Sequence, residues 1–298
     1  MNSRPAIIIN ASSGNGDNEA LREKLAQLFA ASGLSPEILP VADGERLETL
    51  TTRLLKQGHC PIVAGGGDGT ISAVASVLRD QKTPLGVLPL GTLNHFAKDL
   101  KIPLDLKGAV EVIAGGNVAE VDVAEVNEHV FVNNSSLGLY PSIVHRREQQ
   151  QERLGRGKWP AFIWAALSVL RLYPFINIRL TADEIELNRK TPFVFIGNNE
   201  YQMEGVNIGA RSCLNGGKLS LHVAHRTGRW GLVRFALRAL FGTLRNEKDL
   251  DVICAKEIWI ETRHKLVRVA TDGEVSLMET PLHYRIHPGG LRVLTPKE

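Results

Sequence analysis

Two glycine-rich loops carry most of the residues in this chain whose types and spacing could do chemistry. The first loop is GGGDGT, at residues 65–70. The second loop is PLGTLNH, which follows the apolar run LGVL and includes Thr92 and Asn94. Glycine lets a backbone approach a ligand closely, and amides at the start of a helix bind phosphate. The two loops therefore predict a nucleotide site, with one loop at the phosphates and the other nearer the base or ribose. The first loop, GGGDGT, follows the apolar run PIVA and includes Gly66, Gly67, Asp68, Gly69 and Thr70.

Asp68 is the unexpected residue of the first loop, because a carboxylate repels the phosphate that such loops bind. Two arrangements would remove this repulsion. The carboxylate could hold backbone amides of the loop, or it could face a magnesium ion that the nucleotide carries. A glycine turn capped by an aspartate, without any ligand, explains GGGDGT equally well when the segment is taken alone.

Other phosphate-binding motifs are absent from the sequence. No GxxxxGK[ST] segment occurs, and Glu19 stands where the third glycine of a GxGxxG fingerprint beginning at Gly14 would fall. No GxSxG segment occurs either. We therefore exclude a P-loop, a dinucleotide fingerprint and a hydrolase nucleophile elbow.

The segments around the two loops alternate between strand and helix patterns. Strands that alternate with helices imply βαβ units and a mostly parallel sheet, which binds ligands at the carboxyl ends of its strands. The predicted strands are 6–9, 61–64 and 85–89, and the predicted helices are 20–33, 45–58, 70–80 and 94–100.

The pattern changes after about Asp122. Short alternating runs such as VFVNN, INIRL, EIELN, FVFIGN, EIWIET and LHYRIH follow one another, separated by turn residues. Runs of this kind predict an antiparallel sheet or a sandwich. The chain is thus expected to have two domains with a boundary near Asp122.

Composition limits the class of protein. The chain has 298 residues, 43% of them hydrophobic, which is enough for one large or two ordinary domains with real cores. Its 35 basic and 32 acidic residues give a formal net charge of only +3, so nothing calls for a nucleic-acid partner. Three scattered cysteines favour a reducing compartment, and no apolar segment suits a signal peptide or a membrane span. We expect a cytoplasmic protein.

Four segments resemble those of a known kinase family. GGGDGT resembles the GGDGT loop of a superfamily of diacylglycerol kinase-like lipid kinases, NAD kinases and phosphofructokinases. IIINASSGNG resembles the first strand and loop of the lipid kinases, PLGTLNHFA resembles their PxGTxNxFA loop, and RVATDGE resembles their third motif. The four segments occur in family order over nearly the whole chain. They select the bacterial lipid kinases of the diacylglycerol and sphingosine kinase type.

This resemblance implies an architecture. An α/β domain of the NAD kinase type with a mostly parallel sheet would occupy residues 1–122, and an all-β sandwich-type domain would occupy residues 123–287. ATP would bind in an active-site cleft between the two domains. The remaining residues, 288–298, would form a strand that returns to the first domain.

The resemblance also implies the roles of individual residues. Asp272 and Glu274 would be the catalytic carboxylates, one accepting the proton of the lipid hydroxyl and the other orienting it or holding metal, with the assignment open. Taken alone, TDGE is explained more simply as an ordinary DG hairpin turn, and the other motifs favour catalysis. ATP and Mg²⁺ would be the cofactors. The ATP-binding residues would be Asn10, Ser13, Gly14, Gly66, Gly67, Asp68, Gly69, Thr70, Thr92 and Asn94.

Several positions depart from the family pattern. Gly216 stands where the family has an aspartate that helps to bind a structural magnesium ion, so the metal ligands of this chain are unknown. Ala73 replaces the acidic residue of GGDGTxxE, and Ala11 replaces the proline of the first motif. Leu93 and His95 stand where GTGND has glycine and aspartate, and His95 is expected to be a helix-start residue. The loss of carboxylates points to a changed metal arrangement or a lower activity.

Two segments suggest how a lipid kinase would meet its substrate. Residues 145–175 place five cations before a tryptophan-containing apolar run, and residues 228–245 combine arginines with an apolar helical pattern. Such segments suit the interface of an anionic membrane, although helices that only cover the sandwich explain them equally well. With a lipid substrate, we expect peripheral association with the inner face of the membrane. The cations of the first segment are Arg146, Arg147, Arg153, Arg156 and Lys158.

Three functions remain open from the sequence. The first is an ATP-dependent lipid kinase that phosphorylates diacylglycerol or a sphingoid or ceramide-type lipid. The second is a soluble-substrate kinase of the NAD kinase type, which GNNE at residues 197–200 would fit. The third is a nucleotide-binding regulator without turnover, which the missing carboxylates would fit. Neither the lipid nor the oligomeric state is encoded in a motif, and a homo-oligomer is compatible with the sequence.

Overall fold

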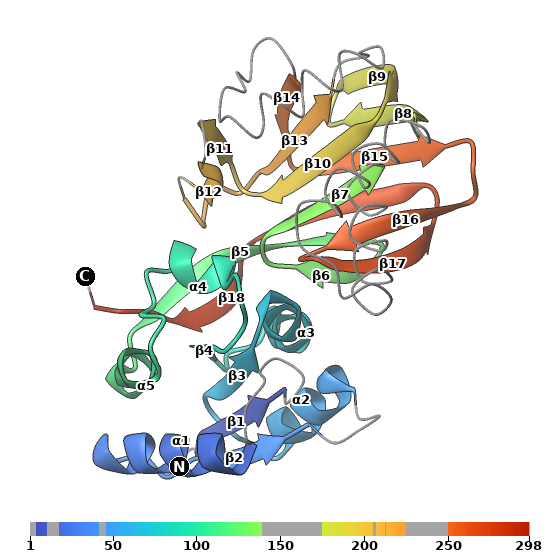
Figure 1. Ribbon diagram of the computed structural model, residues 1–298. Coiled ribbons are helices and arrows are strands. Elements are labelled where there is room, and N and C mark those ends of the chain that lie inside the picture. Colours follow the sequence, from blue (N-terminus) through green and yellow to red (C-terminus); the bar gives the residue numbers. More distant parts are fainter. Residues whose placement is uncertain are drawn as a thin grey trace, which may run out of the picture. The chain divides into compact units, whose positions relative to one another are not determined.

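The chain divides into two compact units (Figure 1). Unit 1 consists of residues 1–123, 129–133 and 287–298, and unit 2 of residues 124–128 and 134–286. The segment 129–133 therefore lies in unit 1, although the sequence division assigned it to the second domain. This computed structural model describes residues 4–10, 18–41, 46–138, 175–204, 207–211, 213–224 and 250–297.

Unit 1 is built on a parallel sheet. Its strands are β1 (Ala6–Ile9), β2 (Glu37–Pro40), β3 (Ile62–Gly66) and β4 (Leu85–Pro89), in the order β2-β1-β3-β4. All pairings among them are parallel, and β1, β3 and β4 are buried along their whole length. Parallel strands covered on both faces read as continuous apolar runs, so the mostly parallel α/β fold was predictable and is confirmed.

The helices of unit 1 follow from the order of the strands. The chain moves from β1 outward to β2 and then back past β1 to β3. Right-handed crossovers therefore place α1 on one face of the sheet and α2 and α3 on the other. Helix α1 packs against α5, and α2 packs against α3 (Figure 1). The helices are α1 (Asn18–Ala31), α2 (Leu47–Lys56), α3 (Asp68–Leu78), α4 (His95–Asp99) and α5 (Leu106–Gly115).

Unit 2 contains two antiparallel sheets and a separate hairpin. One sheet has the order β14-β13-β10-β7-β16-β17, and the other contains β15, β8, β9 and the first part of β18. The strands are β7 (Asn134–Gly138), β8 (Ile176–Ala182), β9 (Ile185–Thr191), β10 (Phe193–Asn198), β11 (Tyr201–Glu204), β12 (Asn207–Arg211), β13 (Leu219–Ala224), β14 (Leu250–Ala255), β15 (Glu257–Thr262), β16 (Leu266–Thr271), β17 (Glu274–Glu279) and β18 (Leu282–Leu294).

Alternating side chains form the core of unit 2. In β15, Ile258 and Ile260 are buried whereas Glu257, Trp259 and Glu261 are exposed, as expected for a strand with one face against a core. Tyr284 of β18 is fully buried, and its hydroxyl lies 3.1 Å from the Ser135 hydroxyl of β7, which links the two sheets. The all-β sandwich predicted for the second part of the chain is therefore confirmed.

Two strand boundaries differ from those that the sequence pattern predicts. The run VFVNN is divided, because β6 (His129–Phe131) ends before β7 begins at Asn134. The runs at 282–287 and 291–295 form one strand, β18. Its HPGG segment stays in the strand because Gly289 adopts a φ of +61° and its N–H donates to Asp122 Oδ1 at 2.8 Å. That carboxylate belongs to β5 (Val118–Val126), which pairs with β18.

None of the helices within the described residues is long and apolar enough to span a bilayer. The basic apolar segments at 145–175 and 228–245 lie almost entirely outside the described residues. Among their residues only Phe175 is described, so their expected membrane role stays a prediction.

His222 is a buried histidine in the six-stranded sheet. It faces Phe195 across β13 and β10, with ring centroids 5.6 Å apart and ring planes at 68°. Its side chain is 1% exposed, and within the described part of the chain neither ring nitrogen has a hydrogen-bond partner. Burial lowers the pKa of His222 to about 4 because the charged form loses its hydration. The ring is therefore neutral at neutral pH.

This histidine predicts a loss of stability in mild acid. The unfolded chain binds the proton at about pH 6.5, whereas the folded pKa is about 4, so acid favours unfolding between these values. The contribution is complete above the unfolded pKa and is lost as the pH falls toward 4. When the pH is lowered from about 7 to 5, the unfolding free energy of the wild type should fall by about 2 kcal/mol more than that of His222→Gln, as measured by urea titrations. His264→Gln, at an exposed position, is the control, and equal pH dependence of all three proteins would refute the explanation.

Candidate functional site

Two loops of unit 1 leave neighbouring parallel strands at the same end of the sheet. Gly66 at the end of β3 is the register partner of Pro89 at the end of β4. The N–H groups of Leu90 and Gly91 both donate to the Gly66 carbonyl, at 3.1 and 3.2 Å. A Cβ atom at Gly91 would lie 2.5 Å from the Cα atom of Gly67. Glycine is needed here because the two loop backbones touch.

The first loop leads directly into helix α3. Gly67 is the N-cap, and Asp68, Gly69 and Thr70 form the first turn. The first bond within the helix joins the N–H of Ile71 to the Gly67 carbonyl at 3.1 Å, so the amides of the first turn have no partner inside the helix. Amides of this kind, together with the helix dipole, favour a bound phosphate.

The Asp68 carboxylate joins the two loops. Its Oδ2 accepts the N–H of His95 at 3.2 Å, and its Oδ1 accepts the N–H of Phe96 at 3.1 Å. These amides begin helix α4, where a negative charge is favourable. Of the two arrangements that the sequence left open for Asp68, the structure shows the one in which the carboxylate holds backbone amides. They belong to the second loop's helix rather than to the first loop.

Asn10 connects the end of β1 to the start of α3. Its Nδ2 donates to Thr70 Oγ1 at 3.1 Å, and its N–H donates to the Gly65 carbonyl at 2.9 Å. Strand β1 has β2 on one side and β3 on the other, so the crevice between β1 and β3 is the point at which the direction of winding reverses. Open parallel sheets bind their ligands at such a point. Asn10 and Thr70 therefore lie where this topology predicts a ligand.

The second loop is closed by Asn94. This residue is 6% exposed and has a left-handed backbone with φ of +50°. Its Nδ2 donates to the carbonyls of Pro89 and Gly91, at 3.2 and 2.8 Å. Its Oδ1 is buried and accepts no hydrogen bond from any described residue, whereas neighbouring Thr92 is exposed. The loop thus keeps one buried acceptor available. Ser13 and Gly14, the other residues expected at this site, lie outside the described residues.

The TDGE segment forms a tight hairpin turn in unit 2. Asp272 and Gly273 link β16 to β17 with φ values of +48° and +90°, and Thr271 pairs with Glu274. Two consecutive positive φ values characterise the type I′ turn that DG sequences favour. The chain therefore reverses direction between Thr271 and Glu274, as the simpler explanation of TDGE predicts.

Asp272 is also fixed to the adjacent strand. Its N–H donates to the Asn134 carbonyl at 2.9 Å, and its Oδ1 accepts the N–H of Asn134 at 3.0 Å. Glu274 is exposed at the start of β17. Sequence reasoning did not identify Asn134, because the contribution of this residue is a backbone group that no motif encodes.

The segment around Gly216 does not fit the structural magnesium ion that the family resemblance implies. The Gly216 N–H donates to Asn199 Oδ1 at 2.8 Å, and the Asn199 carbonyl accepts the hydroxyl of Ser220 at 2.7 Å. A Cβ atom at Gly216 would lie 3.0 Å from both Asn199 Oδ1 and Cys213 Sγ. No described set of histidine, cysteine and acidic residues is arranged to hold a metal ion. A side-chain amide therefore orders this segment.

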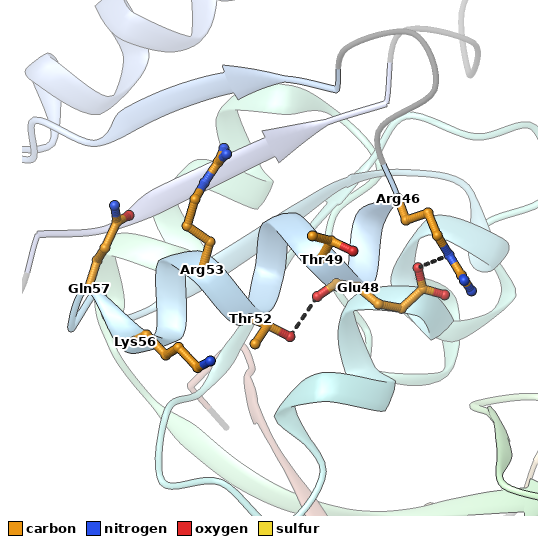
Figure 2. A pocket seen from close by; sticks show the side chains of 7 residues that line it. All are labelled: Arg46, Glu48, Thr49, Thr52, Arg53, Lys56 and Gln57. Carbon is orange, nitrogen blue, oxygen red and sulfur yellow. Dashed lines mark hydrogen bonds and ion pairs between the residues drawn. The ribbon is translucent and has the colours of Figure 1, made fainter.

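A surface pocket of unit 1 lies apart from the residues of these two loops. It is an open depression of about 690 Å³ along helix α2, lined by residues of the helix and by its N-cap and C-cap residues (Figure 2). Arg46 forms an ion pair of 3.8 Å with Glu48, and the hydroxyl of Thr52 donates to the Glu48 carbonyl. None of the residues predicted to bind ATP lines this depression. The lining residues are Arg46, Glu48, Thr49, Thr52, Arg53, Lys56 and Gln57.

Known proteins share both the sequence pattern and the fold. The diacylglycerol kinase catalytic domain model matches residues 4–126, and the YegS C-terminal NAD kinase beta sandwich-like domain model matches residues 140–295. Relatives named "Probable lipid kinase YegS" include proteins from Salmonella gallinarum, 27% identical, and Escherichia fergusonii, 26% identical. Both alignments cover 99% of this chain and 97% of the relative.

Solved structures agree with this relationship at the level of the fold. A diacylglycerol kinase structure from Bacillus anthracis has a TM-score of 0.71 at 22% identity, and a second structure from that organism has 0.74 at 24%. Both comparisons cover 99% of this chain and 97% of the other. The two family models together account for the α/β part and the sandwich part, and the second alone matches more than half of the 298 residues. The chain therefore belongs to the diacylglycerol kinase-like family of lipid kinases.

Proposed function

We propose that this protein transfers the γ-phosphate of ATP to the hydroxyl of a membrane lipid, such as diacylglycerol or a sphingoid or ceramide-type lipid. One observation carries the nucleotide half of the proposal. Asp68, in the first turn of α3, accepts hydrogen bonds from the first amides of α4. These bonds join two glycine loops at the carboxyl ends of neighbouring parallel strands. The family relationship supports the lipid half.

The residues of unit 1 would hold ATP as its magnesium complex. The first-turn amides of α3 would bind phosphate oxygens, and the buried Oδ1 of Asn94 would accept a hydrogen bond from the base or the ribose. Asp68 would act as a positioning residue, because its oxygens accept amides of α4. Magnesium would arrive with the nucleotide and neutralise charge on its phosphates.

The carboxylates of unit 2 would act on the acceptor lipid. The lipid hydroxyl oxygen would form a bond to the γ-phosphorus while the bond from that phosphorus to the bridging oxygen of ADP breaks. One carboxylate, Asp272 or Glu274, would take the hydroxyl proton. The reciprocal bonds with Asn134 would keep Asp272 in position before the substrate binds. We further propose that the enzyme works at the inner face of the membrane.

Replacement of Asp272 tests the catalytic assignment. Asp272→Asn keeps an oxygen that can accept the N–H of Asn134 but cannot take a proton at neutral pH, so kcat should fall by about 10²- to 10⁴-fold without loss of folding. Transfer of labelled phosphate from ATP and magnesium to lipids in mixed micelles measures the effect. The matched control is Asp183→Asn, since Asp183 also has φ of +48° in a hairpin and accepts the N–H groups of Lys256 and Glu257.

The acceptor panel in the same assay separates the candidate functions. It contains diacylglycerol, a sphingoid lipid, a ceramide and NAD. Transfer to NAD alone would refute the lipid proposal and favour a soluble-substrate kinase. ATP binding without transfer to any acceptor would favour a regulator without turnover. If Asp183→Asn reduced kcat as much as Asp272→Asn, the loss would reflect hairpin geometry rather than proton transfer.

A change at Asp68 tests its positioning role. Asp68→Asn removes the negative charge at the start of α4 and leaves one oxygen in place of two. The hydrogen bonds between the two loops should therefore be weaker. We expect the Kd for ATP to rise about tenfold, in line with the loss of charge-assisted hydrogen bonds of about 1.5 kcal/mol. Asp105→Asn is the control, because Asp105 caps α5 through the N–H of Gly108 at 2.8 Å. An unchanged ATP affinity in calorimetry would contradict the role.

The segment at Gly216 predicts how stability depends on metal. Nucleotide-free protein should unfold at the same temperature in magnesium and in EDTA, because Asn199 rather than an ion holds Gly216. Asn199→Ala should lower the unfolding free energy by about 1 kcal/mol in both conditions. Thermal unfolding followed by circular dichroism measures both effects. A rise of the wild-type Tm in magnesium alone, without nucleotide, would show that an accessory ion binds.

A further inference from the structure

The hairpin of β16 and β17 exposes two leucines on one face. These strands lie at an edge of the six-stranded sheet. Val269 and Met278 are buried, and successive residues of a strand point to opposite faces, so Leu266 and Leu277 lie on the face away from that core. The side chains of Leu266 and Leu277 are 51% and 60% exposed. Single exposed leucines are common, but these two are diagonal neighbours on one hairpin.

Cations surround these leucines. Arg268 is the direct cross-strand partner of Leu277 and lies on the same face as Leu266. Arg263 and Lys265 are exposed in the turn that precedes β16. Within the described part of the chain, none of these three cations has an ion-pair partner. We call the surface made by Arg263, Lys265, Leu266, Arg268 and Leu277 the Leu266–Leu277 patch.

Cations outnumber carboxylates at the leucine end of the hairpin. Glu279 is exposed and directly opposite Leu266, so one carboxylate lies beside the three cations of the patch. Asp272 and Glu274 lie at the opposite end, in and after the turn, a distance of about five residues or ~17 Å along the strand. The leucine end is therefore cationic, and an anionic surface is its electrostatic complement. Exposed apolar side chains among unpaired cations suit the headgroup region of an anionic bilayer.

We propose that the Leu266–Leu277 patch binds the surface of an anionic membrane. The leucines enter the boundary between headgroups and acyl chains, while the three cations pair with lipid phosphates. This inference rests on the proposed function and deepens it, because it names a surface through which the enzyme meets the membrane that holds its substrate. In the sequence, the residues of the patch lie outside the basic apolar segments 145–175 and 228–245.

Vesicle co-sedimentation of the nucleotide-free protein tests the patch. Vesicles of phosphatidylcholine alone are compared with vesicles that also contain phosphatidylglycerol. We expect the wild type to bind the anionic vesicles and Leu266→Ser/Leu277→Ser to bind them at least about tenfold more weakly. The variant Arg263→Gln/Lys265→Gln/Arg268→Gln should lose most of the preference for phosphatidylglycerol, roughly fivefold per cation.

A matched control uses exposed apolar residues of unit 1. Leu104 and Val118 are 49% and 47% exposed, so Leu104→Ser/Val118→Ser makes two comparable changes at residues that are not part of the patch and should bind as the wild type does. Circular dichroism checks the folding of each variant. If the leucine variant does not fold, the cation variant decides the outcome, because it leaves the apolar side chains unchanged.

Two results would overturn the proposal. One is binding of the leucine or cation variant to anionic vesicles at the wild-type level. The other is self-association of the wild type in sedimentation velocity that the leucine variant abolishes, which would assign the patch to a second copy of the chain. Lipid phosphorylation in detergent micelles, measured in parallel, distinguishes this failure from failure of the proposed function. A wild type without kinase activity in micelles refutes the function, while the vesicle data still decide the patch.

Discussion

The candidate nucleotide site depends on the bonds from the Asp68 carboxylate to the first two amides of α4. The two loop backbones touch at Gly67 and Gly91, which have no side chains that could join the loops. The Asp68 carboxylate lies at the start of both α3 and α4, where it joins the two loops and interacts favourably with both helix dipoles. The aspartate that looked unfavourable for phosphate thus organises the site.

The same physical device occurs twice in unit 2. Asp272 and Asp183 both occupy left-handed turn positions, and each accepts a backbone amide from an adjacent strand. Turn geometry alone therefore cannot mark a catalytic aspartate. What sets Asp272 apart is its sequence context, since RVATDGE resembles the third motif of the kinase family. Geometry explains how the carboxylate is held, and family membership gives the reason to expect chemistry from it.

The segment at Gly216 shows how a chain can lose a carboxylate without losing local order. A magnesium ion is usually held through one or two carboxylates, whereas the Asn199 amide needs only the N–H of Gly216 at 2.8 Å. Asn199 adopts φ of +69°, a conformation that asparagine tolerates better than most residues. The GNNE segment, which suggested an NAD kinase from the sequence, includes this asparagine. A structural role accounts for it.

The sequence by itself determined the class of fold and the segments that matter. Continuous apolar runs such as Ala6–Ile9 predict buried parallel strands, and alternating runs such as EIWIET predict a sandwich, because each pattern reflects how many faces of a strand are buried. Only the tertiary structure decided the partners: that Asp68 holds α4, that Asn10 reaches Thr70, and that Asn134 fixes Asp272. These contacts join residues separated by 27, 60 and 138 positions, and several use backbone groups that every residue carries. A local pattern cannot encode such pairs, because they form only when the sheets bring distant strands into register.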